Sequence, residues 1–391
     1  MEKKQSLDTI CIQGGWQPKN GEPRQLPIYQ STTFKYTTSE QMGRLFDLEE
    51  NGYFYTRLAN PTNDAVAAKI CALEGGVGAM LTSSGQAANF YAIMNLCQAG
   101  DHVVSSAAIY GGTTNLFTVT IPKMGVECTL VSPDATEEEL AAAFRPNTKA
   151  LFAETIANPA LTVLDIEKFA KVAHEHGVPL IVDNTFATPI NCRPFEWGAD
   201  IVTHSTTKYM DGHAMTVGGC IVDSGNFDWE AHHDKFTGLT EPDESYHGII
   251  YTQKFGKLAY ITKATSQLMR DLGSIQSPQN AFLINVGLET LHLRMPKHCE
   301  NALKVRLRHD RRYHQQWRKR VYGGRAGTAG PQRSVHFPHG SGCRCPSGGT
   351  GKEKVRHGAA EKPAQGRTQK DSAKKECGKG DLIWETLLLR K

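Results

Sequence analysis

Short apolar runs alternate with helical stretches through the middle of the chain, and this alternation constrains the fold more than any other feature. The apolar runs lie at 79–82, 102–105, 127–131, 150–154, 180–182 and 201–204. Between them, stretches such as 63–75, 136–144 and 165–176 have apolar residues at helical spacing. Strands that alternate with helices in this way form a mostly parallel sheet with helices on both faces. The sequence therefore predicts an α/β fold.

The chain divides into four segments of different character. Residues 1–60 have weak periodicity and are predicted to form an N-terminal arm, while 61–257 carry the alternating pattern of a large α/β domain. Residues 258–305 have helical spacing and are predicted to begin a C-terminal domain. From 306 to 391 the chain has 21 Lys and Arg against 7 Asp and Glu, with 13 Gly and little apolar periodicity. We expect this basic tail to be disordered and the small C-terminal domain to be incomplete, because such a segment cannot readily form a packed core.

Composition excludes several classes of protein. Hydrophobic residues at 39% and charged residues at 21% are typical of a soluble globular protein. No apolar run reaches the roughly 18 residues of a membrane span, so no membrane partner is expected. The N-terminus lacks the apolar stretch of a secretory signal, which predicts a cytoplasmic protein. Ten cysteines without a C-x-x-C pair indicate neither a zinc site nor a disulfide scaffold, and we expect no metal.

Polar residues follow several of the apolar runs. Ligands bind at the carboxyl ends of the strands in a parallel sheet, so 83–86, 183–184 and 205–208 are predicted to form one site. Lys208 carries the strongest signal, because burial favours the neutral amine that forms a Schiff base with a carbonyl. Ser205 and Thr207, on the same turn, have hydroxyl groups suited to a phosphate. The alternative is a surface lysine beside ordinary turn residues.

Three further residues or pairs fit the same site. Asp183 could keep a pyridine nitrogen protonated, although an aspartate after a strand more often caps a helix or forms a turn. Gly85 and Gln86 open a helical stretch whose first backbone N–H groups could bind a phosphate, although many helix starts look alike. Tyr110 precedes two glycines and could stack on a planar ring, although a tyrosine at the edge of a hairpin is the commoner explanation.

In their order along the chain, these patterns resemble the Cys/Met-metabolism family of pyridoxal-phosphate (PLP) enzymes. The resemblance covers roughly 6–304 and rests on Y-T-R-x-x-N-P-T from Tyr55, S-S-G-x-A-A from Ser83, the Tyr-Gly at 110, E-x-x-x-N-P from Glu154, V-D-N-T from Val182 and H-S-x-T-K-Y-x-x-G-H from His204. It implies an aminotransferase-like (type I) fold, a PLP cofactor and a homotetramer with shared active sites.

The resemblance also assigns roles residue by residue. It implies that Lys208 forms the Schiff base, that Asp183 pairs with the ring nitrogen and that Tyr110 stacks on the ring. Asn158 would contact the 3-oxygen of the cofactor. Four residues would hold the phosphate: Gly85, Gln86, Ser205 and Thr207.

The arm would contribute across a subunit boundary. The resemblance implies that Tyr55 and Arg57 reach the cofactor phosphate of a neighbouring subunit. Tyr55 would also assist as an acid or base.

Within the family, the long approach to Tyr55 and the segment 270–291 favour an O-acetylhomoserine sulfhydrylase. Its reaction, a trans-sulfuration step of methionine biosynthesis, converts O-acetylhomoserine and sulfide to homocysteine and acetate by γ-replacement, with Lys208 moving the protons. The alternatives are a methionine γ-lyase or an enzyme of the cystathionine γ-synthase and lyase type.

The chain departs from the family pattern at Arg306. The arginine that clamps the substrate carboxylate in the family is not found after 305, and the tail resembles translation in a shifted reading frame. The rival interpretation is a genuine basic tail on a catalytically inactive relative, which would bind a polyanion. The tail has no known nucleic-acid-binding pattern, which disfavours a nucleic acid as partner.

Overall fold

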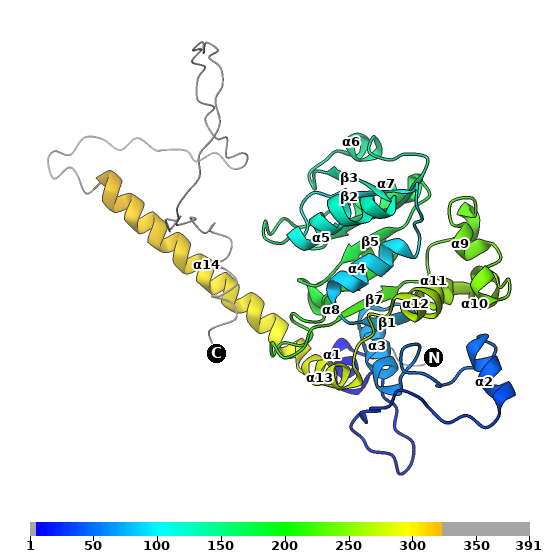
Figure 1. The fold of residues 1–391 in the computed structure, drawn as a ribbon. Coiled ribbons are helices and arrows are strands. Elements are labelled where there is room, and N and C mark those ends of the chain that lie inside the picture. The colour runs from blue at the N-terminus through cyan, green and yellow to red at the C-terminus, as the bar shows by residue number, and fades with distance from the viewer. Residues whose placement is uncertain (1–4, 323–391) are drawn as a thin grey trace, which may run out of the picture. The chain divides into compact units, whose positions relative to one another are not determined.

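A seven-stranded sheet forms the centre of the molecule (Figure 1). The computed structural model describes the backbone of residues 5–322 and the side chains of residues 5–306. The strands are β1 (Gly78–Thr82), β2 (His102–Ser106), β3 (Glu127–Val131), β4 (Thr148–Glu154), β5 (Leu180–Asp183), β6 (Ile201–His204) and β7 (Gly219–Asp223). Across the sheet their order is β1-β7-β6-β5-β4-β2-β3, and only β7 runs antiparallel to its neighbours.

Six of these strands coincide with the six predicted apolar runs, so the α/β prediction is confirmed. The seventh, β7, was not predicted. It has only three apolar residues, at 220–222, and it follows two glycines. It pairs with β1 on one side and β6 on the other, through contacts between segments distant in sequence that a local pattern does not reveal.

Helices cover both faces of the sheet (Figure 1). The helices up to the end of the sheet are α1 (Leu7–Gln13), α2 (Ser39–Phe46), α3 (Pro61–Glu74), α4 (Gly85–Met94), α5 (Gly111–Asn115), α6 (Glu137–Ala141), α7 (Ile166–Glu175) and α8 (Thr188–Asn191). Those that follow β7 are α9 (Thr237–Thr240), α10 (Tyr251–Phe255), α11 (Ala259–Lys263), α12 (Arg270–Leu272), α13 (Pro278–Glu289) and α14 (Leu291–Tyr322).

Alternation along β5 shows how the sheet separates its two cores. Ile181 packs in one hydrophobic cluster with residues of α4 and α11. Leu180 and Val182 pack in another cluster with residues of α6 and α7. Successive side chains of a strand point to opposite faces, so a strand covered on both faces is apolar at every position. This is why the strands appear in the sequence as continuous apolar runs.

Local signals fix the start and end of α3. The side chain of Asn60 accepts a hydrogen bond from the N–H of Thr62, and Pro61 occupies the first helical position. The helix ends at Gly75, whose φ of 83° lies in the left-handed region that favours glycine. The predicted helix at 63–75 therefore begins two residues earlier than expected.

Residues 258–295 pack in the same hydrophobic clusters as the sheet rather than apart from it. A compact unit extends from Met1 to Arg306, and α13 buries Ala281, Ile284 and Leu288 in the cluster that contains α3. Within this segment a π-helical stretch, Ala264–Met269, connects α11 directly to α12. We find no membrane-length apolar helix in the described part of the chain.

The last helix continues past the predicted boundary at 305. α14 runs to Tyr322, and residues 306–322 contain neither glycine nor proline, so nothing in their sequence ends a helix. The first glycines of the tail are Gly323 and Gly324. The predicted disorder of the tail stays a prediction, and its part over 323–391 lies outside the described residues.

Candidate active site

The amino end of α4 forms a seat for an anion. Ser84 caps the helix by accepting a hydrogen bond from the N–H of Ala87 at 3.1 Å. The N–H groups of Gly85 and Gln86, in the first turn, have no partner within the helix and point toward its amino end. Together with the helix dipole they favour a negatively charged group such as a phosphate.

Gly85 lies directly against the residue that follows β6. A Cβ atom at this position would be 2.6 Å from the Cβ of Ser205 and 2.9 Å from its Cα. Only glycine lets the two loops approach so closely. The structure therefore brings together Gly85 and Ser205, two of the four predicted phosphate residues, from segments far apart in the sequence.

Lys208 lies in the turn just after β6, as predicted. Its N–H donates to the carbonyl of Ser205 at 3.3 Å, and its carbonyl accepts from Gly212 at 2.8 Å. The hydroxyl of Thr207 donates to the carbonyl of Gly218 at 3.2 Å and accepts from its N–H at 3.0 Å. Thr207 would have to turn away from Gly218 to donate to a phosphate.

Asp183 ends β5 with both carboxylate oxygens held in place. Oδ1 accepts from the N–H of Thr185 at 3.0 Å and from its hydroxyl, and Oδ2 accepts from Nδ2 of Asn89 at 3.2 Å. The Thr185 hydroxyl also accepts from the N–H of Ser205 at 2.7 Å. Asn89 and Thr185, which sequence reasoning did not assign, thus link the predicted ring-nitrogen partner to α4 and to the loop after β6.

Tyr110 stands at the start of α5 with about half of its surface exposed. A Cβ on Gly112 would be 2.5 Å from the Tyr110 ring and 3.2 Å from Nε2 of Gln86, so this glycine lets both side chains approach. Oε1 of Gln86 accepts from the Thr113 hydroxyl at 3.0 Å. The exposed ring of Tyr110 and the helix start that carries Gln86 therefore lie close together.

Glu154, at the end of β4, holds two of the loops at this edge. Its carboxylate accepts from the N–H of Tyr110 at 2.6 Å and from the N–H of Asn158 at 3.2 Å. Burial, and to a smaller extent the charge of Asp183 on the adjacent strand, raise the pKa of Glu154 to about 8. The sequence signal for this residue was a charged side chain at the end of an apolar run, within the pattern E-x-x-x-N-P.

The arm residues Tyr55 and Arg57 contact each other. The guanidinium of Arg57 lies 5.1 Å from the centroid of the Tyr55 ring, and its charge contributes to lowering the pKa of Asp271, after the hydrogen bond from Arg270. No hydrogen bond among the described side chains joins Tyr55 or Arg57 to Gly85, Asp183 or Ser205. The other predicted residues follow the carboxyl ends of the strands, whereas Tyr55 and Arg57 precede the first strand of the sheet.

The residues present fit PLP. Its phosphate matches the N–H groups at the start of α4, a cradle that a Cβ on Gly85 would fill. A carboxylate fixed by Asn89 and Thr185 suits a protonated ring nitrogen, and the exposed ring of Tyr110 suits the flat face of the cofactor. Within the described residues, no cluster of His, Cys, Asp and Glu side chains is suited to hold a metal ion.

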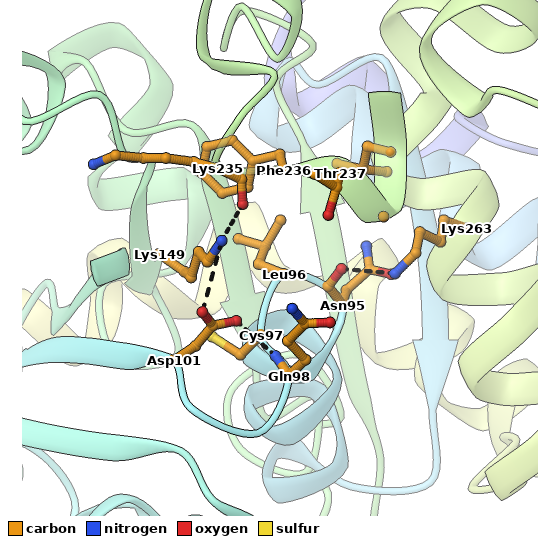
Figure 2. A pocket seen from close by; sticks show the side chains of 12 residues that line it. Asn95, Leu96, Cys97, Gln98, Asp101, Lys149, Lys235, Phe236, Thr237 and Lys263 are labelled. Carbon is orange, nitrogen blue, oxygen red and sulfur yellow. Dashed lines mark hydrogen bonds and ion pairs between the residues drawn. The ribbon is translucent and has the colours of Figure 1, made fainter. Parts of the chain in front are cut away.

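A cavity of about 120 Å³ lies at the opposite edge of the sheet, near the amino ends of β2 and β4 (Figure 2). Nζ of Lys149 lies 3.6 Å from Oδ1 of Asp101, while Lys235 directs its amine to the carbonyl of His176. Nζ of Lys263 donates to the carbonyl of Asn95 at 2.9 Å, just past the end of α4. These lysines bind to acceptors within the fold. None of the residues that line this cavity belongs to the candidate cofactor site.

Known proteins confirm the fold and the cofactor. The model of the Cys/Met metabolism PLP-dependent enzymes matches residues 8–307. A homocysteine/cysteine synthase of Kluyveromyces lactis is 45% identical over 303 residues, which are 76% of this chain and 68% of the relative. An O-acetyl-L-homoserine sulfhydrylase of Leptospira meyeri is 45% identical over 307 residues, 76% of this chain and 69% of the relative.

Among solved structures, an O-acetylhomoserine (thiol)-lyase of Campylobacter jejuni carries a pyridoxyl-lysine phosphate. It superposes with a TM-score of 0.74 at 36% identity, over 77% of this chain and 74% of that one. The expected aminotransferase-like (type I) fold and the expected cofactor are therefore confirmed. The chain belongs to the family of Cys/Met metabolism PLP-dependent enzymes.

Proposed function

We propose that this protein catalyses γ-replacement on O-acetylhomoserine with sulfide, giving homocysteine and acetate. The observation that carries the proposal is the cluster at the carboxyl edge of the sheet, where Gly85 meets Ser205 and Asp183 is held by Asn89 and Thr185. The choice of substrate is supported by the relatives, which are named homocysteine synthases and O-acetyl-L-homoserine sulfhydrylases.

Lys208 and Asp183 have separate roles in the proposed reaction. PLP, when bound, supplies an electron sink that stabilises negative charge on the substrate carbon next to the amine. Lys208 binds the cofactor through its amine and then moves protons at Cα and Cβ of the substrate. Asp183 keeps the proton on the ring nitrogen. The Cγ–O bond to acetate breaks and a Cγ–S bond to sulfide forms, and one proton from hydrogen sulfide is released with the acetate.

We further propose that the active sites are shared between subunits of a homotetramer. In this arrangement Tyr55 and Arg57 of one subunit reach the cofactor phosphate of its neighbour, and Tyr55 assists proton transfer. No hydrogen bond among the described side chains joins them to Gly85 or Ser205 of their own chain, and the proposal is supported by the family pattern that these residues match.

Product analysis tests the proposed reaction. With O-acetylhomoserine and sulfide, the holoenzyme should release homocysteine and acetate. A γ-lyase would instead release 2-oxobutyrate and ammonia whether or not sulfide is present, and a cystathionine γ-synthase would need cysteine as the thiol. Formation of 2-oxobutyrate at the same rate with and without sulfide would contradict the proposal.

The region after Arg306 bears on how well substrate binds. The family match ends at residue 307, next to the point where the chain becomes strongly basic. We propose that a shift of reading frame near codon 305 replaced the arginine that clamps the substrate carboxylate, a loss that would weaken substrate binding. Resequencing the gene around this codon tests the shift, and turnover of a frame-restored variant tests its consequence.

We also propose that the protein works in the cytoplasm. Seven cysteines among the described residues are free thiols, as expected in a reducing compartment. Cell fractionation with an antibody against the protein checks this location.

A further inference from the structure

Two loops at the carboxyl edge of the sheet are tied to one carboxylate. Oε1 of Glu154 accepts from the backbone N–H of Tyr110, in the loop after β2, at 2.6 Å. Oε2 accepts from the backbone N–H of Asn158, in the loop after β4, at 3.2 Å. Each oxygen of this side chain therefore serves a different loop, and each loop carries one residue assigned to the cofactor ring.

The position of Glu154 is costly for a charged group. Glu154 is only 6% exposed, and its register neighbour on β5 is Asp183, a second carboxylate. Burial comes first and the charge of Asp183 second among the causes that raise the pKa of Glu154 to about 8, while the two N–H groups act in the opposite direction. Two carboxyl groups side by side in a buried place are rarely retained for stability alone.

A carboxylate suits this position because of its two acceptor atoms. A glutamine side chain has one acceptor oxygen, and its amide nitrogen would face the second N–H donor to donor. Only an acidic side chain of this length can accept from both loops at once.

We infer that Glu154 is a positioning residue that holds the Tyr110 and Asn158 loops at the distance the cofactor ring requires. The inference rests on the roles proposed above for Tyr110 and Asn158, and Glu154 itself needs no contact with cofactor or substrate. Its loss lets the two loops separate, so the ring is held less tightly and in a less fixed orientation.

The test compares Glu154→Gln with a matched control, Glu127→Gln. Glu127 is also a strand glutamate, but it lies on the edge strand β3, its side chain is 68% exposed and it pairs with Arg145. Three quantities are measured: hydrogen exchange of peptides covering 106–112 and 155–161 in the cofactor-free protein, the dissociation constant of PLP, and the visible circular dichroism per bound PLP.

We expect Glu154→Gln to exchange about tenfold faster in both peptides and to bind PLP about tenfold more weakly, which corresponds to the loss of about one hydrogen bond. The circular dichroism of the bound cofactor should change, since a fixed ring orientation gives the signal. Glu127→Gln should match the wild type in all three measurements. Unchanged PLP affinity and unchanged circular dichroism in Glu154→Gln would overturn the inference, even if exchange increased.

A second variant covers the case in which Glu154→Gln does not fold. Glu154→Asp keeps the carboxyl group but is one methylene shorter, so it should protect only one of the two peptides. If both variants unfold, Glu154 is a stability residue of the sheet and the inference is wrong. PLP affinity and its circular dichroism do not depend on which substrate reacts, so a failed sulfide assay leaves this result interpretable.

Discussion

Adding a single methyl group at Gly85 tests whether the phosphate seat is built as described. In Gly85→Ala the new Cβ would be 2.6 Å from the Cβ of Ser205, whereas carbon atoms in contact ordinarily lie about 3.5–4.0 Å apart. Ser205 must move by about 1 Å, and its N–H is tied to the hydroxyl of Thr185. The phosphate seat at the start of α4 therefore widens, or the hydrogen bond from the Ser205 N–H to the Thr185 hydroxyl lengthens.

The expected magnitude follows from two opposing effects. Forcing a methyl group into a packed place costs about 1–3 kcal/mol. Replacing glycine by alanine in a helix stabilises it by up to about 1 kcal/mol, which partly offsets this cost. If the remaining strain, up to about 2 kcal/mol, falls on the phosphate seat, PLP binds up to about thirtyfold more weakly, since about 1.4 kcal/mol is tenfold in affinity.

Fluorescence titration of the cofactor-free protein with PLP measures this change. Gly43→Ala is the control, because Gly43 lies in α2 and a Cβ there would meet no atom within 4 Å. It should keep the affinity of the wild type. If Gly85→Ala folds and binds PLP as tightly as Gly43→Ala does, the close contact with Ser205 does not shape the site, and the assignment of the seat is refuted.

Four further outcomes are expected. Lys208→Ala should abolish both the yellow colour of the holoenzyme and the adduct trapped by borohydride; survival of the colour would point to another lysine. Asp183→Asn should still bind PLP but lose most turnover, because an unprotonated ring nitrogen is a poorer electron sink, and near-normal activity would remove its proposed role. Mixed oligomers of inactive Lys208→Ala and inactive Arg57→Ala subunits should regain some activity, since one hybrid site contains both residues; no recovery in verified hybrids would count against shared sites. Burial lowers the pKa of Lys263 to about 8, so above this pH the unfolded chain holds more protons than the folded one. Between pH 8 and 10 the wild type should therefore gain up to about 3 kcal/mol of stability relative to Lys263→Met, as measured by urea unfolding. A stability difference that stays constant over this range would contradict the lowered pKa.

The fold could be predicted to the extent that it depends on local pattern. Most of the six strands were found because a strand buried on both faces is a continuous apolar run, as β5 is over 180–182. The order of the strands was not predictable, because β7 pairs with β1 and β6 through contacts distant in sequence. α14 extends past the expected boundary because composition alone does not show where a helix ends without a glycine or proline.

The candidate site divides in the same way. The rule that ligands bind at the carboxyl ends of strands grouped 83–86, 183–184 and 205–208, and the structure places Gly85 against Ser205. The supporting residues were missed, because their roles depend on contacts across the sheet. Asn89 is a polar residue on a buried helix face, and only the structure shows that it donates to Asp183.

The pairing of β1 with β7 has a consequence for protein synthesis. Thr82, at the end of β1, lies opposite Gly219 of β7. β1 can therefore pair with β7 only after most of the sheet has been synthesised. Pairing between strands so distant in sequence is slow. The start of α4, which follows β1, reaches its final position against the sheet only after this pairing. All the residues proposed above to contact the cofactor ring nevertheless lie upstream of Asp223, and the basic region begins at Arg306. A nascent chain therefore already contains these residues before the ribosome reaches the codons where the family resemblance ends.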